Sequence, residues 1–241
     1  MPSTSSVFSN LLSGIGGLGL QRTSLVSSAT QAADCGHWLA LRIAEDVTDQ
    51  QLCELHDVWK QSGLLAITSL VVPGAISIEN IAHDSWNHVL VEEVALSDAR
   101  SSAVMGVGPM CYASTRVAEK FCTDFHGSVI GLSEWSAPNA VEPQFEARAE
   151  QQKSFIRCCK ALIGSLSHEK ISYISLWTQT RRVVTASRSA ARNAGIAAGS
   201  AYEFCLPHSQ RREGEQLLRE GEKVRMWFPV GAAEIRRAVG G

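Results

Sequence analysis

The sequence predicts an α+β protein with a β-rich core, built as a mostly antiparallel sheet or a jelly-roll-like sandwich, with flanking helices and a flexible N-terminal tail. Apolar stretches of strand length recur along the chain, and helix-like stretches are inserted between them without regular βαβ alternation. Ser and Gly are frequent near the N-terminus. A chain of 241 residues with 45% hydrophobic composition can bury a sizeable core.

The predicted organisation has three parts: a Ser/Gly-rich tail over 1–36, a β-rich core domain over 37–180, and a basic region over 181–241. The longest apolar run is interrupted by Pro73 and is too short to cross a membrane. The N-terminus lacks the pattern of a secretory signal. Seven cysteines in such a chain favour free thiols over a disulfide framework.

A glycine motif stands out in the predicted tail. Gly14, Gly16 and Gly19 match G-x-G-x-x-G, and Asp34 follows at the distance of a ribose-binding carboxylate. That fingerprint works only between a buried strand and a helix, since the pyrophosphate lies at the helix N-terminus. The flanking segments are rich in Ser and Thr and show no helical stripe. A flexible tail is therefore favoured over a nucleotide-dependent enzyme, which remains a third hypothesis.

Local patterns predict the elements of the core. Residues 37–45 alternate, with apolar side chains on one side and Arg42 on the other, as in a half-buried strand. A helix is expected over 48–63, because Thr48 and Gln51 form a T-x-x-Q capping box. Further strands are expected over 64–72, 88–98, 128–135, 170–180 and 223–230.

Two of the later segments are less regular. In 88–98 the apolar phase changes near Glu92 and Glu93, which indicates a β-bulge. An apolar stripe predicts a helix over 143–167, whereas 181–195 is ambiguous between helix and loop.

Charge is divided unevenly along the chain. Residues 1–150 hold 7 Lys+Arg against 17 Asp+Glu, a net charge of −10, and residues 151–241 hold 15 against 7, a net charge of +8. An asymmetry of this size indicates an anionic partner for the C-terminal part, or else a basic face balanced by an acidic one within one fold.

The basic residues suggest a nucleic-acid surface. Arginine forks match phosphate oxygens, and aromatic rings nearby can stack on bases, which together favour single-strand binding without sequence preference. The buried-strand alternative is preferred for the aromatic residues Trp177, Trp227 and Phe228. The predicted nucleic-acid-binding residues are Arg157, Lys160, Arg181, Arg182, Arg188, Arg192, Arg211, Arg212, Lys223 and Arg225.

No complete catalytic or metal constellation is visible in the sequence. Cysteine and histidine recur as near neighbours, as in Cys53/His56 and Cys205/His208, but without the C-x-x-C or H-x-x-x-H spacing typical of zinc sites. No G-x-S-x-G motif marks a nucleophile. We therefore expect no catalytic residues, no metal and no cofactor, and we expect a protein that is not an enzyme.

One stretch, 67–102, resembles the central region of the 30K-type movement proteins of plant RNA viruses. The similarity lies in an apolar strand over 64–72, the turn Pro73-Gly74, and a later strand that ends in Leu96-Ser97-Asp98. The Ser-rich N-terminus and the basic C-terminal half also resemble the movement proteins of umbraviruses and their tombusvirus-like relatives. By this resemblance Asp98 is the family's signature aspartate, with a structural role at the end of a strand.

The resemblance implies a viral movement protein that binds single-stranded RNA without sequence specificity and carries it from cell to cell. Its expected partners are single-stranded RNA and host plasmodesmal or membrane proteins, with self-association as a further expectation. Its expected location is the host cytoplasm and the plasmodesmata. The alternative is a small viral capsid protein with a β-sandwich fold, although the N-terminal segment carries only Arg22 before residue 42.

Overall fold

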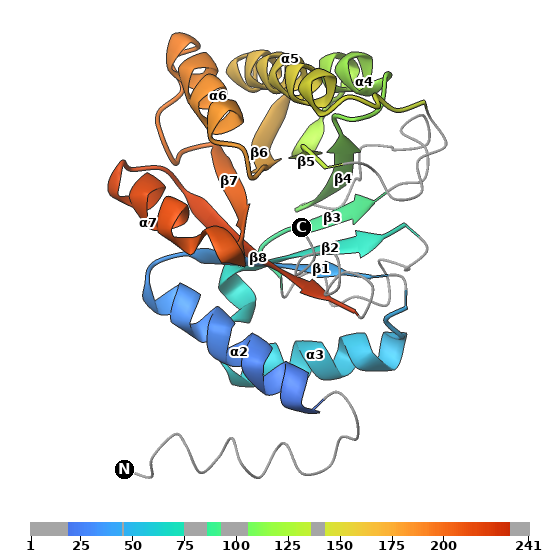
Figure 1. Cartoon of the computed structure of the whole chain (residues 1–241), viewed down its shortest axis with the longest axis vertical. Helices are drawn as coiled ribbons and strands as arrows, with labels where there is room; N and C mark the ends of the chain where they lie inside the picture. Colours follow the sequence, from blue (N-terminus) through green and yellow to red (C-terminus); the bar gives the residue numbers. More distant parts are fainter. Residues whose placement is uncertain (1–18, 45, 75–85, 93–105, 136–142, 232–241) are drawn as a thin grey trace.

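The architecture is a closed barrel of eight parallel strands in chain order (Figure 1). The computed structural model describes residues 19–44, 46–74, 86–92, 106–135 and 143–231. The barrel closes where the first and last strands pair, from Trp38 opposite Arg225 to Ile43 opposite Val230. The strands are β1 (Trp38–Ile43), β2 (Thr68–Pro73), β3 (Val89–Glu92), β4 (Val107–Tyr112), β5 (Gly127–Ser133), β6 (Ile171–Trp177), β7 (Tyr202–Pro207) and β8 (Val224–Val230).

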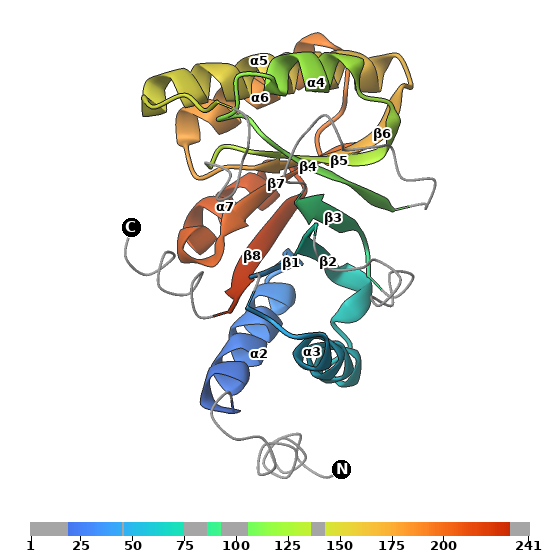
Figure 2. The ribbon, with the colours of Figure 1, turned by 90° about the vertical axis from the view of Figure 1, so that its right-hand side faces the viewer.

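Helices cover the outside of the barrel. In both ribbon views, α4, α5 and α6 lie together on one side, and α2 and α3 lie on the opposite side (Figures 1 and 2). The helices are α2 (Gly19–Asp34), α3 (Asp49–Gln61), α4 (Ala118–Asp124), α5 (Arg148–Ser167), α6 (Arg181–Asn193) and α7 (Arg211–Arg219). Helices that follow parallel strands on the outside of a closed sheet define a TIM-type α/β barrel.

The capping box predicted for the first core helix is confirmed at the start of α3. The Gln51 backbone N–H donates to Thr48 Oγ1 at 3.3 Å, and the Thr48 N–H donates to Gln51 Oε1 at 2.9 Å. The apolar stripe of this helix buries Leu52, Leu55 and Trp59. Local sequence was sufficient here because a cap and a stripe depend only on neighbouring residues.

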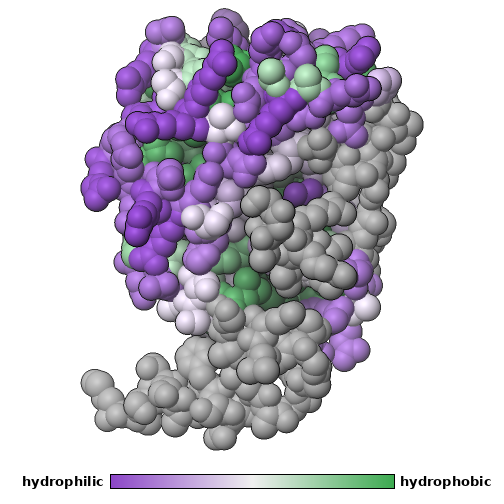
Figure 3. Space-filling model, in the orientation of Figure 1, coloured by the Kyte–Doolittle hydropathy of each residue, from purple (hydrophilic) through white to green (hydrophobic). Residues whose placement is uncertain are grey.

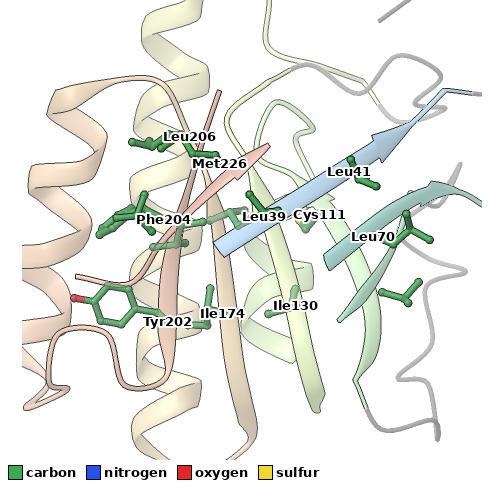
Figure 4. Packing of buried hydrophobic residues seen from close by; sticks show 14 of the residues in the cluster. Leu39, Leu41, Leu70, Cys111, Ile130, Ile174, Tyr202, Phe204, Leu206 and Met226 are labelled. Atoms are coloured by element: carbon green, nitrogen blue, oxygen red, sulfur yellow. The ribbon is translucent and has the colours of Figure 1, made fainter. Parts of the chain in front are cut away.

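Each strand is buried on both faces. On β1, the outward side chains of Leu39, Leu41 and Ile43 belong to the main apolar cluster. Figure 4 shows Leu39 and Leu41 among the other members of this cluster. The inward side chain of Ala40 belongs to a second cluster that fills the barrel. The inner cluster contains Ala40, Val71, Leu90, Met110, Tyr112, Val129, Trp177, Cys205 and Trp227. Burial on both faces is the usual condition of a parallel sheet.

Glycine makes room for large side chains inside the barrel. A Cβ atom at Gly131 would lie 2.8 Å from the Met110 sulfur and 2.9 Å from Leu90 Cδ1. The Met110 and Leu90 side chains thus occupy the space that a side chain at position 131 would need, which keeps the interior closely packed.

The predicted fold class is wrong. Every strand pair is parallel, so the core is neither an antiparallel sheet nor a jelly-roll sandwich. Two strands, β4 and β7, were not predicted, and neither were α2, α4 and α7. Without those strands the alternation of strand and helix could not be recognised in the sequence.

The barrel also runs through the predicted domain ranges. Strands β7 and β8 lie in 181–241 and close the barrel against β1, which lies in 37–180. Helix α2 lies largely within the predicted tail, 1–36. The short strands predicted over 128–135, 170–180 and 223–230 are confirmed as β5, β6 and β8, with boundaries shifted by a few residues at most.

Several predicted features fall outside the described residues. Gly14, Gly16 and Asp98 are among them, and so is Glu93, so the bulge predicted beside Glu92 is not addressed. Gly19 is the first residue of α2. Within the described part of the chain, none of the helices combines the length and apolar character needed to span a bilayer.

Candidate functional site at the carboxyl end of the barrel

Three polar side chains from different strands meet at the carboxyl end of the barrel. Arg42 lies near the end of β1, and Glu92 and Tyr112 are the last residues of β3 and β4. Parallel strands in a closed barrel place their carboxyl ends on one face, and groups from separate strands converge there. Topology alone therefore brings together residues that are 50 and 70 positions apart in the sequence.

The three side chains form one hydrogen-bonded group, here called the Arg42–Glu92–Tyr112 cluster. Arg42 Nε donates to Glu92 Oε1 at 2.8 Å, and Arg42 Nη2 donates to the Tyr112 hydroxyl oxygen at 3.0 Å. The Tyr112 hydroxyl donates in turn to Glu92 Oε1. The guanidinium also lies 6.0 Å from the centre of the Tyr112 ring. Charge-assisted contacts of this kind hold all three groups in fixed positions.

The cluster is partly open to solvent. The side chains of Arg42 and Glu92 are 11% and 13% exposed. Both contacts to the carboxylate use Oε1, and no side chain of the described residues donates to Oε2. A carboxylate with one oxygen committed and the other open can accept a hydrogen bond from a cationic ligand. A tyrosine hydroxyl bonded to a carboxylate and an arginine can also give up or receive a proton.

An aromatic wall stands on the same end of the barrel. Trp135 follows β5, Trp177 ends β6, and Trp227 belongs to β8. The rings of Trp135 and Trp227 meet edge to face at 5.5 Å between centroids, and those of Trp177 and Trp227 lie 6.1 Å apart. Trp177 Nε1 donates to Ser175 Oγ at 3.0 Å, whereas the buried Trp227 Nε1 has no hydrogen-bond partner among the described residues. A ligand acceptor could satisfy that orphaned donor.

Glu134 organises the neighbouring loop. Its carboxylate accepts from Thr178 Oγ1 at 2.5 Å, from the Gln179 N–H at 3.3 Å, and from the Thr180 hydroxyl. Gln152 Nε2 of α5 adds a fourth contact at 3.3 Å. Because Thr180 is the N-cap of α6, the carboxylate lies where a negative charge suits the helix dipole. Glu134 thus fixes the loop after β6, and both of its carboxylate oxygens already accept hydrogen bonds there.

A second ion pair lies deep inside the barrel. Arg225 Nε and Nη2 donate to the two oxygens of Glu203 at 2.7 and 2.9 Å, and both side chains are fully buried. Arg225 also donates to Leu39 O, Ile67 O and Asn87 Oδ1. Burial by itself would raise the pKa of Glu203, but the neighbouring guanidinium outweighs burial and holds this pKa below its usual range. All three guanidinium nitrogens of Arg225 donate hydrogen bonds within the protein, so this ion pair has a structural role.

The structure separates the predicted nucleic-acid-binding residues into two groups. Arg225 is inside the barrel, Arg188 is bound to Glu220 and Glu222, and Lys223 lies over the rings of Trp38 and Tyr173. Arg157 and Arg211 pair with Glu119 and Glu215 at the surface. The other members are exposed: Lys160, Arg181, Arg182, Arg192 and Arg212.

The predicted polyanion surface is therefore not one contiguous patch of free cations. Buried Arg225 cannot reach a nucleic acid, which corrects its assignment, and Arg188 is neutralised by two carboxylates. The face over α6 and α7 is nevertheless largely hydrophilic (Figure 3). Contact between the exposed members and single-stranded RNA stays a prediction. The burial of Trp177, Trp227 and Phe228 confirms the preference for core positions.

Sequence reasoning missed the cluster itself. Arg42 was placed on a solvent face, Glu92 was interpreted as part of a bulge, and Tyr112 lies in a strand that was not predicted. A usable signal was present, because Arg42 and Glu92 each interrupt an apolar strand near its carboxyl end.

Comparisons with known proteins identify the fold. No protein-family model matches the chain, and no curated protein matches it. Among solved structures, one that resembles it is proline utilization A (PutA) from Bdellovibrio bacteriovorus inactivated by N-propargylglycine, with a TM-score of 0.61 and 13% identity over 89% of this chain. A PutA mutant from Bradyrhizobium japonicum matches with a TM-score of 0.47 and 15% identity over 89% of this chain. The chain spans 31% and 22% of the length of these two proteins.

These findings overturn the viral interpretations. A closed parallel barrel that resembles an enzyme of proline utilization is neither the sheet of a 30K-type movement protein nor a capsid sandwich. The expectation of a protein that is not an enzyme depended on that resemblance and on the absence of a visible constellation, and it is corrected with them. The predicted host partners and plasmodesmal location are not tested by the structure.

Proposed function

We propose that this protein is an enzyme that acts on a small amino acid or related amine at the carboxyl end of its barrel. The observation that carries the proposal is the Arg42–Glu92–Tyr112 cluster, which places a guanidinium, a carboxylate and a phenol hydroxyl on the face where barrels of this type carry their chemistry. The Bdellovibrio neighbour is a proline utilization protein inactivated by N-propargylglycine, so amino acids are the first compounds to test.

Opposite charges side by side suit a zwitterion. Because no described side chain donates to Glu92 Oε2, this oxygen can accept a hydrogen bond from a substrate ammonium group, while the Arg42 guanidinium supplies positive potential for a carboxylate. The partial burial of both side chains strengthens these interactions over those in bulk water. Trp135 and Trp227 provide an apolar wall for the remainder of a small substrate.

Tyr112 is the proton-transfer group in this proposal. Its hydroxyl is held between Arg42, which donates to its oxygen, and Glu92, which accepts its proton. Positive charge beside the phenol oxygen stabilises the phenolate that forms when the proton leaves. Glu92 thus has two roles, one oxygen binding the substrate amine and the other receiving the proton from Tyr112.

Calorimetric titration of the full chain with L-proline, glycine and L-alanine tests substrate binding. We expect Glu92→Gln to weaken the tightest binder by about tenfold or more, since a hydrogen bond to a charged group contributes about 1.5–3 kcal/mol. The matched control is Glu213→Gln, an exposed residue of α7, which should leave affinity unchanged. Equal affinity in the wild type and in Glu92→Gln would remove Glu92 from the site.

Turnover of each bound compound, followed by proton NMR, tests Tyr112. Tyr112→Phe keeps the ring and removes the hydroxyl, so binding should change by no more than about threefold while the rate falls by about 10²-fold or more. A Tyr112→Phe protein that turns over as fast as the wild type would contradict the assigned role.

A further inference from the structure

Three buried thiols meet between β4 and the helices that cover it. Cys111 lies on β4, Cys122 on α4 and Cys158 on α5, and all three are buried. Helices α4 and α5 lie side by side over this part of the barrel in both ribbon views (Figures 1 and 2). We call these residues the thiol trio.

The members of the trio are close enough to interact. The sulfur atoms of Cys111 and Cys122 are 3.7 Å apart. Cys122 also interacts electrostatically with Cys158, whose sulfur lies 3.9 Å from Ser154 Oγ. Cys122 is therefore the central member, with one thiol from the strand and one from a neighbouring helix as partners.

The environment differentiates the three sulfurs. Hydrogen bonds to Cys111 and Cys158 raise the pKa of Cys122 well above its usual range, and burial acts in the same direction. The hydrogen bond from Cys122 lowers the pKa of Cys158, although burial opposes it. Of Cys122 and Cys158, Cys158 is thus the thiol that ionises more readily, and the thiolate is the nucleophilic form of cysteine.

The other cysteines are arranged differently. Cys159 is adjacent to Cys158 in sequence, and burial raises its pKa to about 12. Cys205 lies inside the barrel, 3.1 Å from Ser175 Oγ, and Cys35 and Cys53 are exposed. No second group of adjacent thiols is found in the described part of the chain.

We propose that the thiol trio is a site of reversible oxidation by hydrogen peroxide, which ends in a disulfide between Cys111 and Cys122. The Cys158 thiolate attacks one peroxide oxygen, which breaks the O–O bond, gives the sulfenic acid and releases hydroxide. The proton that Cys158 lost on ionising combines with this hydroxide to give the first water molecule. The Cys122 thiol then attacks the sulfenic sulfur and forms a Cys122–Cys158 disulfide. The sulfenic hydroxyl leaves with the Cys122 proton as the second water molecule. Cys111 attacks the Cys122 sulfur, and the Cys158 thiolate leaves and takes the proton of Cys111.

The net reaction consumes one peroxide and two thiols and gives one disulfide and two water molecules. Cys158 is regenerated, so it acts as the entry point and the bridge forms on the other two residues. The bridge would tie α4 to β4 at the position next to Tyr112. This inference does not depend on the proposed function, because it rests on the 3.7 Å approach of the Cys111 and Cys122 sulfurs and on the electrostatics of Cys122 and Cys158.

Peptide mapping of the folded full chain tests the proposal directly. The protein is treated with hydrogen peroxide, its free thiols are blocked with N-ethylmaleimide, and it is digested with trypsin without reduction. Cleavage after Lys and Arg places Cys111 in peptide 101–116, Cys122 in 121–148 and Cys158 in 158–160. We expect peptides 101–116 and 121–148 to be joined, and reductant to separate them.

Variants test the assigned order of events. Cys158→Ser should slow formation of the bridge by roughly tenfold, because direct oxidation of Cys122, the less ionised of the two thiols, is slower. Cys111→Ser should trap the link between 121–148 and 158–160. The matched control, Cys159→Ser, should behave as the wild type and shows which thiol of peptide 158–160 reacts.

Two results would overturn the inference. One is a folded protein in which peroxide leaves peptides 101–116 and 121–148 unlinked while Cys35 and Cys53 are oxidised. The other is a Cys158→Ser protein that forms the Cys111–Cys122 bridge as fast as the wild type, which would remove Cys158 from the reaction.

Discussion

Replacement of Arg225 by methionine is expected to lower the free energy of unfolding by about 3–5 kcal/mol, because it leaves the Glu203 carboxylate buried without its cation. The loss is large because Arg225 is fully buried and donates to Glu203, Leu39 O, Ile67 O and Asn87 together. Methionine fills part of the volume, so the effect reports mainly on the lost charge and hydrogen bonds. Urea unfolding followed by circular dichroism gives the value.

The control for Arg225 is an ion pair at the surface. Arg157 and Glu119 also meet at 2.7 Å, but their side chains are 45% and 50% exposed. Arg157→Met should therefore change stability by less than about 1 kcal/mol. A double variant that also replaces Glu203 by leucine should recover part of the loss, because no isolated charge then remains buried. If Arg225→Met and Arg157→Met lower the free energy of unfolding equally, Arg225 is not inside the barrel.

Adding a single methyl group at Gly108 is expected to lower the free energy of unfolding nearly as much as Arg225→Met. A Cβ atom there would lie 1.9 Å from the Val129 carbonyl oxygen and 2.8 Å from its carbonyl carbon. These atoms belong to the backbone of β5, which is paired on both sides and cannot move away alone. Gly108→Ala should therefore cost more than about 3 kcal/mol, at or beyond the upper end for overpacked cores.

Gly164→Ala is the matched control, and it is expected to stabilise the protein instead of destabilising it. Gly164 lies in α5 with no atom within 4 Å of an added Cβ. Gly164→Ala should raise stability by about 0.5–1 kcal/mol, since alanine loses less backbone freedom in a helix. The pair is compared in the same urea titration. If Gly108→Ala has the same urea midpoint as the wild type, β4 and β5 do not pair as closely as described.

Local patterns in the sequence predicted elements whose signals are short in range. Helix α3 is defined by its cap and its stripe, and β1, β2, β5, β6 and β8 by runs of apolar residues, all of which involve near neighbours. The parallel arrangement could not be predicted in this way. It depends on polar residues inside the barrel, whose partners are distant in sequence.

Arg42 shows why the antiparallel prediction arose. An arginine that alternates with apolar residues normally marks the solvent face of a half-buried strand. In a barrel the same alternation separates an inner face from an outer one, and the inner face accepts a charge when another strand supplies its partner. Glu92, 50 residues away, does so here.

The two missed strands have a different cause. β4 (VGPMCY) contains Gly108 and Pro109, and β7 (YEFCLP) contains Glu203 and Pro207, residue types that are rare in strands. Glycine is required at 108 by the close approach of β5, and Glu203 is required by Arg225. Gly108 and Glu203 are thus explained by tertiary contacts, which single-sequence strand propensities do not include.

The uneven charge was real, but its interpretation was incomplete. Several basic residues of the C-terminal part are paired with carboxylates from that same part, as Arg225 is with Glu203 and Arg188 with Glu220 and Glu222. Counting charges along a chain does not show which of them face one another across a barrel.

The central claim is that function resides at the carboxyl end of the barrel, around Glu92. A crystal structure of the full chain soaked with the amino acid that binds best in calorimetry tests it most directly. We predict that the ligand ammonium nitrogen lies about 3 Å from Glu92 Oε2, beside Trp135 and Trp227. A ligand bound instead at the amino end of the barrel, beside Lys223 and Trp38, with the Arg42–Glu92–Tyr112 cluster unaltered, would contradict it.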